Sequence, residues 1–196
     1  MSWLISDNWE GGNTSFMENN AQEFYLEMHS KGYSLNSICA MLGNIQLESA
    51  INPTQKELPT SQWTNQKGFG LCQWTPAQSL FDYCEVRGLS FTDGTAQCIY
   101  LNDTGSLYWG NSQNPYAPSV SPPITWSDFT VSELSLDTLT DYFMYYYEKP
   151  NYEQSQLTKE ERRNNASQWY DFLSENPPTP PSRRKKMPLY FYLLPC

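Results

Sequence analysis

Apolar residues recur at helical spacing over most of the chain, and this pattern predicts a mainly α-helical protein. The clearest example covers residues 35–48, where Ser34 is the expected N-cap and Asn52-Pro53 bars continuation of the helix. The same spacing predicts further helices over residues 15–31, 76–87, 93–103, 132–148 and 158–173. Together the predicted helices form one domain over residues 1–176.

Polar and glycine-rich segments interrupt the helical pattern. Residues 53–67 are polar and expected to be irregular, and residues 104–126 are expected to form a long surface loop. A small β element is predicted over residues 62–74, where Gly68 and Gly70 let the backbone approach a neighbour closely. The expected fold class is therefore mainly α: a helical domain with one small β element, which gives an α+β arrangement.

The end of the chain differs in composition from the rest. Residues 177–182, Pro-Pro-Thr-Pro-Pro-Ser, predict a stiff extended linker. Residues 183–196 form a tail that is first basic and then apolar. This tail either docks on a partner protein or an anionic surface, or is a disordered terminus. Its apolar part is shorter than the roughly 20 residues that span a bilayer.

Composition narrows the classes of function. The net charge of −9 argues against a nucleic-acid partner, because phosphate binding needs clustered Lys and Arg. Seven Trp and fourteen Tyr either line a groove that stacks on sugar rings or fill a large core. Five cysteines without C-x-x-C spacing argue against a disulfide framework. No signal peptide or membrane span is recognised, so synthesis in a reducing cytoplasm is expected.

Elimination leaves carboxylates as the plausible catalytic groups. His29 is the only histidine and no Gly-x-Ser-x-Gly is present, which disfavours Ser-His-Asp, Cys-His and zinc-dependent hydrolases. Gly68-Phe69-Gly70 is too short for a phosphate-binding loop and no lysine follows it directly. Neither a metal nor a cofactor is predicted.

Glu48 is the strongest candidate among the carboxylates. A catalytic acid that must stay protonated gains from apolar neighbours, which disfavour its charged form. The C-terminal pole of a helix acts in the same direction, because it is the negative end of the helix dipole. Glu48 is expected at such a pole. The alternative is an exposed glutamate at a helix end.

Three blocks of sequence resemble the phage tail-type lysozyme family, over about residues 15–175. The resemblance implies a lysozyme-like fold and cleavage of the β-1,4 bond between N-acetylmuramic acid and N-acetylglucosamine. It also implies a role in a phage tail that opens the wall of a Gram-positive host. The blocks are Met41-Leu42-Gly43-Asn44 with Gln46, Glu48-Ser49 and Asn52-Pro53; Gly68-Phe69-Gly70-Leu71 with Gln73-Trp74-Thr75-Pro76; and Tyr147-Glu148 with Pro150 and Trp169-Tyr170.

The resemblance also assigns roles to individual residues. Glu48 is implied as the general acid that protonates the glycosidic oxygen. Gln73 would bind saccharide or Glu48, or be a structural amide. Trp74 would form a saccharide-contacting wall, or belong to the core. Tyr147 and Glu148 would border the cleft, although Glu148 could be a solvated helix end.

The second catalytic group is left open. Glu57 is the only other carboxylate between Glu48 and Gln73, and it is the candidate base for an attacking water. Without such a base, the protein would be a lytic transglycosylase. A free endolysin and a non-catalytic saccharide-binding tail component are also compatible with the sequence. The expected partners are peptidoglycan and phage tail proteins.

Overall fold

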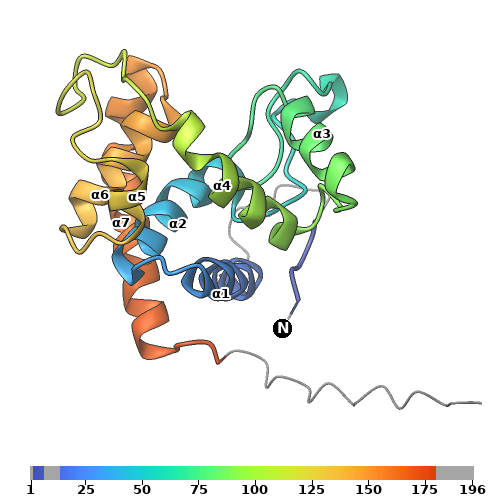
Figure 1. Cartoon of the computed structure of the whole chain (residues 1–196), viewed down its shortest axis with the longest axis horizontal. Coiled ribbons are helices and arrows are strands. Elements are labelled where there is room, and N and C mark those ends of the chain that lie inside the picture. Colours follow the sequence, from blue (N-terminus) through green and yellow to red (C-terminus); the bar gives the residue numbers. More distant parts are fainter. Residues whose placement is uncertain (1, 7–13, 180–196) are drawn as a thin grey trace, which may run out of the picture.

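The computed structural model describes residues 2–6 and 14–179. The predicted tail, residues 183–196, and the second half of the predicted linker lie outside these residues. The described part is a bundle of α-helices joined by irregular segments (Figure 1). The elements are α1 (Thr14–Ser30), α2 (Leu35–Ser49), the 3-10 turn η1 (Thr60–Gln62), α3 (Gln78–Arg87), α4 (Gly94–Tyr108), α5 (Trp126–Thr130), α6 (Leu136–Phe143), the π-helical turn η2 (Met144–Glu148) and α7 (Tyr152–Glu175).

Helix α2 is the central element of the fold. It packs chiefly against α7 and α6 and also contacts α1. Ser34 caps its N-terminus by accepting a hydrogen bond from Ser37 N–H, as predicted. The helix ends at Ser49, where Ala50 and Ile51 both adopt positive φ angles. The chain therefore leaves α2 in a sharp turn that begins two residues after Glu48.

Close approach of α7 to α2 depends on Gly43. A Cβ atom at this position would lie 2.5 Å from the backbone oxygen of Arg162 and 2.7 Å from the Ala166 Cβ. A methyl group at such distances would push the helices apart. The glycine in the first sequence block thus brings the middle of α7 against the face of α2 that carries Asn44 and Glu48.

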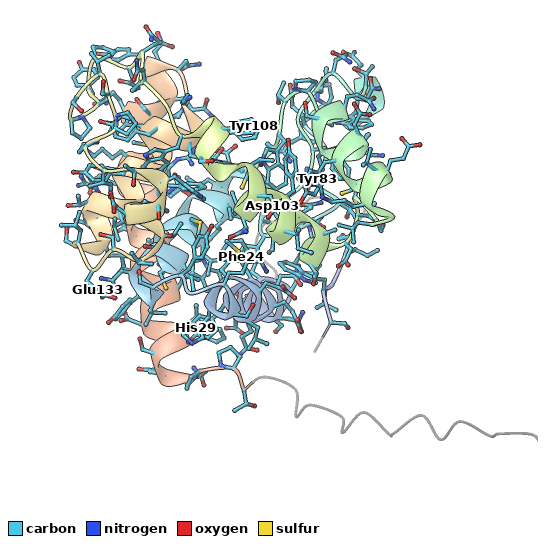
Figure 2. The ribbon with its side chains drawn as sticks, in the orientation of Figure 1. Phe24, His29, Tyr83, Asp103, Tyr108 and Glu133 are labelled. Atoms are coloured by element: carbon cyan, nitrogen blue, oxygen red, sulfur yellow. The ribbon has the colours of Figure 1, made fainter. Side chains whose placement is uncertain are left out.

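Helix α4 separates two parts of the molecule. Figure 1 shows it crossing between the α5–α6–α7 group and the segment that contains α3. Tyr83 of α3 and Asp103 of α4 point toward one another in Figure 2, and the Tyr83 hydroxyl donates to the Asp103 carboxylate. This bond ties α3 to α4.

Side-chain amides hold the irregular segment between α2 and α3, residues 50–77. Gln97 of α4 is fully buried and its Oε1 accepts from Leu71 N–H at 2.9 Å. Its Nε2 donates to the carbonyl oxygens of Pro53 and Phe91, both at 2.7 Å. Asn20 of α1 donates to the Ile51 carbonyl at 2.8 Å. These amides satisfy backbone groups that a sheet would otherwise pair.

The predicted fold class is confirmed, because the described residues are mainly helical with almost no strand. The predicted β element is reduced to two isolated antiparallel bridges, which pair Phe69 with Lys56 and with Trp74. Gly70 has the close neighbour predicted for it: a Cβ there would lie 2.6 Å from Gln97 Oε1.

Several predicted helix boundaries differ from the structure. Helix α7 begins at Tyr152 behind Asn151 as N-cap, so the predicted start at Thr158 is wrong. Helix α4 extends to Tyr108, five residues beyond its predicted end. The predicted helix over residues 132–148 is α6 followed by η2, and α5 was not predicted. Asn151 sets the start of α7 by accepting a hydrogen bond from Gln154 N–H, and the buried rings of Trp126 and Phe129 hold α5 in the core.

Three further observations concern the chemistry of the described residues. Cys39, Cys72, Cys84 and Cys98 are free and buried. Over residues 2–6 and 14–179, no helix is long and apolar enough to cross a bilayer. Within the same ranges, no three His, Cys, Asp or Glu side chains gather in a way that could hold a metal ion.

Candidate active site

A groove of about 550 Å³ opens beside the end of α2. Leu47 and Glu48 of α2 and Gln154 of α7 line its helical side. The irregular segment lines the opposite side, which we call the loop wall. The lining residues of the loop wall are Gln55, Lys56, Glu57, Leu58, Gln73 and Thr75.

Glu48 reaches this groove paired with Arg162. Arg162 Nη2 donates to Glu48 Oε1 at 2.6 Å, and Nη1 donates to Asn44 Oδ1 at 2.8 Å. The Arg162 side chain is 1% exposed and that of Glu48 is 20% exposed. A buried guanidinium requires acceptors, and Asn44 and Glu48 provide them one helical turn apart. Glu48 therefore has a buried cation beside it, unlike the mainly apolar setting expected from the sequence.

Glu148 contributes a second carboxyl group behind the groove. It ends η2, and its Oε1 is buried without a hydrogen-bond partner, although part of the residue is exposed. Burial raises the pKa of Glu148 well above the ordinary value of 4.5; the Glu48 carboxylate also raises it, and Arg162 lowers it. Glu148 in turn raises the pKa of the buried Cys72 thiol, after the larger effect of burial. Glu148 is absent from the groove lining, so it lies behind the cleft that it was expected to border.

Glu57 lies on the loop wall of the same groove as Glu48. Its Oε2 accepts a hydrogen bond from Gly68 N–H at 2.8 Å, and Glu57 N–H donates to the Gly68 carbonyl at 3.0 Å. These two bonds hold the carboxylate at a defined place on the wall. The structure therefore brings the two carboxylates singled out from the sequence to one groove.

Gln73 lines the groove, but its amide is also structural. Its Nε2 donates to the carbonyl oxygens of Gln55 and Gly70, at 3.1 and 3.0 Å. The residue has a positive φ of 46°, and a Cβ on Gly68 would lie 2.9 Å from its Oε1. The glycine thus makes room for the Gln73 side chain.

Trp74 and Tyr147 lie in the core, which agrees with the core alternative for Trp74 and does not bring Tyr147 to the cleft that it was expected to border. Trp74 is 4% exposed and Tyr147 is 6% exposed. The Trp74 indole N–H donates to the Tyr147 hydroxyl at 2.9 Å, so each satisfies a buried polar group of the other. The pair joins the loop segment to η2 beneath the groove.

Comparison with known proteins identifies the family. The model of the phage tail lysozyme family matches residues 19–173.

The chain belongs to the phage tail lysozyme family.

One curated relative of the chain is Morphogenesis protein 1 of Bacillus phage B103. It is 31% identical over 157 residues, which are 79% of this chain. The chain spans only about 39% of the length of that relative. The match supports a phage lysozyme-like role. The family model covers every residue that lines the groove.

Arg162 is a residue of the site that was not predicted from the sequence. A signal for it was present, because Arg162 lies on the buried face of α7 with Ala166, Trp169 and Leu173 at helical spacing. A charged residue on an apolar face needs a buried partner. The identity of that partner, Glu48, required the approach of α7 to α2 at Gly43.

Proposed function

We propose that this tail lysozyme cleaves the β-1,4 bond between N-acetylmuramic acid and N-acetylglucosamine by hydrolysis. The observation that carries the proposal is the opening of Glu48 and Glu57 into one groove, in a chain of the phage tail lysozyme family. Glycosidases normally use two carboxyl groups on either side of the scissile bond, one as an acid and one as a base or nucleophile.

Glu48 is the proposed general acid. Arg162 occupies its Oε1, so the transferred proton is carried by Oε2 and passes to the glycosidic oxygen as the bond breaks. Arg162 is held in turn by Asn44, which fixes the direction of the carboxyl group. Because the acid must be protonated, the rate is expected to fall on the alkaline side of the pH profile.

Glu57 is the proposed base. Its Oε2 is bonded to Gly68, and the carboxylate accepts a proton from the water that attacks the sugar carbon. Gln73 is the proposed saccharide contact on the loop wall, because it lines the groove beside the two carboxylates. No step in this scheme uses a cofactor or metal.

Mass spectrometry of the products from a digest of purified sacculi tests this proposal. Hydrolysis predicts fragments that end in reducing N-acetylmuramic acid. Fragments that end in 1,6-anhydro-muramic acid would overturn the role of Glu57 and indicate a lytic transglycosylase. Binding to sacculi without release of fragments would overturn catalysis and indicate a saccharide-binding component.

We further propose that the protein acts in the phage tail during penetration of the wall. The family and the name of the B103 relative support this role. Mass spectrometry of purified virions is expected to detect the chain in the tail fraction. Its absence from virions together with its presence in the lysate late in infection would indicate a free endolysin instead.

A further inference from the structure

A second hollow, which we call the aromatic pocket, adjoins the groove. It has a volume of about 250 Å³. Four aromatic residues line it: Trp63, Phe81, Phe91 and the largely buried Phe69. Lys56 lines both the aromatic pocket and the groove, so the two share a border. Nothing proposed above for the cleavage reaction uses this pocket.

The aromatic rings support one another and keep the pocket open. Phe81 and Phe91 have ring centroids 4.1 Å apart, and the Phe69 ring meets both edge-on at 5.4 and 5.7 Å. The Trp63 indole N–H donates to the Gly68 carbonyl at 2.8 Å, which fixes the ring. Phe91 is 37% exposed. An apolar surface of this kind, accessible to solvent beside a groove, is typical of a ligand site.

Lys56 gives the pocket a positive charge. Its Nζ lies 5.3 Å from the centroid of the Trp63 ring, a cation–π distance. The residues that line the pocket include no carboxylate, whereas the adjoining groove has Glu48 and Glu57. In a chain with a net charge of −9, this arrangement favours a ligand that is apolar and carries an anionic group.

The chemistry of the lining distinguishes a peptide from a further sugar. A sugar ring presents several hydroxyl groups, and these need polar partners when they are buried. The pocket offers the hydroxyls of Thr54 and Thr92 and the amine of Lys56 as polar side-chain groups. The peptide stem of peptidoglycan begins on the muramic acid ring and carries small apolar side chains and free carboxylates. Its apolar side chains match the aromatic rings, and its carboxylates match the ammonium group of Lys56.

We infer that the aromatic pocket binds the peptide stem of peptidoglycan, with a stem methyl group against Phe81 and Phe91 and a stem carboxylate on Lys56. The inference rests on the proposed function, because it requires a muramic acid ring in the groove. The stem branches from that ring and enters the pocket across the border at Lys56. The pocket thereby makes the protein select glycan strands that still carry peptides.

Two substrates test this selection. Glycan strands with peptide stems are compared with the same strands after an amidase has removed the peptides. For Phe91→Ala and Lys56→Gln, KM on the peptide-bearing strands is expected to rise about tenfold, with kcat unchanged. Phe91→Ala is not expected to change KM on the stripped strands, because Phe91 lines the aromatic pocket and not the groove. Leu107→Ala, at an exposed position of α4, is the matched control and is expected to resemble wild type on both.

Equal effects on the two substrates, or no effect on peptide-bearing strands, would overturn the inference. Circular dichroism and thermal melting confirm that the variants are folded. A separate titration of Glu48→Gln protein with N-acetylmuramyl dipeptide tests the pocket without catalysis. Binding that is lost when Phe91→Ala is added to Glu48→Gln supports the pocket even if the wild type cleaves no glycan. Equal binding by the two proteins would overturn it.

Discussion

The two sides of the groove are held in different ways. The helical side has Glu48 on a helix, and it is fixed by the buried Arg162 and by the contact of α7 with Gly43. The loop wall has no regular strand in the described residues, and side-chain amides such as Gln97 satisfy its backbone groups. Charge and close packing position one carboxylate, and a network of neutral hydrogen bonds positions the other.

The two sides also differ in whether the proposed catalytic residue belongs to the contacts that hold the fold together. On the helical side, the proposed acid is itself part of the network that joins two helices, so changing it also changes an ion pair. On the loop wall, Gln97 supports the backbone from a buried position that does not line the groove. Each side can therefore be disturbed by substitutions that leave the other intact.

The largest effect is expected for Glu48→Gln. The amide keeps the shape and can accept from Arg162, but it has no proton to donate, so activity on cell walls is expected to fall by about 10²–10⁴-fold. Turbidity loss of purified walls measures this. Glu133→Gln, at an exposed position that Figure 2 labels between α5 and α6, is the control with the same charge change. Activity of Glu48→Gln near that of Glu133→Gln would remove Glu48 from the mechanism.

The next effect is expected for Glu57→Gln, the matching change on the loop wall. Loss of the base is expected to reduce kcat by about 10²-fold or more and to leave binding to walls nearly unchanged. Hydrolysis kinetics and a sedimentation assay with sacculi measure the two quantities. A wild-type kcat would mean that Glu57 only anchors Gly68.

Removal of the amide network is expected to weaken the loop wall without touching the groove. Gln97→Leu leaves the Leu71 N–H and the Pro53 and Phe91 carbonyls without their buried partner. Each unsatisfied buried group costs about 1–3 kcal/mol, so the free energy of unfolding is expected to fall by about 3 kcal/mol or more. Urea denaturation measures this, and a loss below about 1 kcal/mol would show that the network is dispensable.

A smaller loss of stability is expected for Gly43→Ala on the helical side. The added methyl group meets backbone and Cβ atoms of α7, so overpacking is expected to cost about 1–3 kcal/mol of unfolding free energy. Gly110→Ala is the control, because the nearest atom to a Cβ there is the flexible end of Lys149, at 3.4 Å. Equal stability of the two variants would refute the close contact.

The smallest effect is expected from Glu148→Gln, as a function of pH. Because the folded-state pKa of Glu148 is raised above 4.5, the folded protein holds more protons than the unfolded chain above that pH. Wild-type stability therefore declines as pH rises from about 4.5 through the folded-state pKa. The Tm of Glu148→Gln minus that of wild type is expected to increase from about pH 4 to about pH 8. A difference that stays constant over this pH range would contradict the burial of this carboxyl group.

The sequence determined the fold class, α2 with its Ser34 cap, and the glycine positions of the loop, because these depend on local patterns. Periodicity reports which face of a helix is buried, and a cap is recognised within about four residues. The same local information placed Glu48 at the end of a helix. It also predicted the close backbone approaches at Gly68 and Gly70, without naming the side chains that fill the space.

Only the tertiary structure decided which groups surround Glu48. Arg162 is 114 positions away along the chain, and Glu148 reaches its buried place through a π-helical turn that periodicity does not predict. Trp74 and Tyr147 have the aromatic character of a saccharide wall, but they meet each other in the core. Residue type states what a side chain can do, whereas its exposure and partners arise from packing between segments that are distant in sequence.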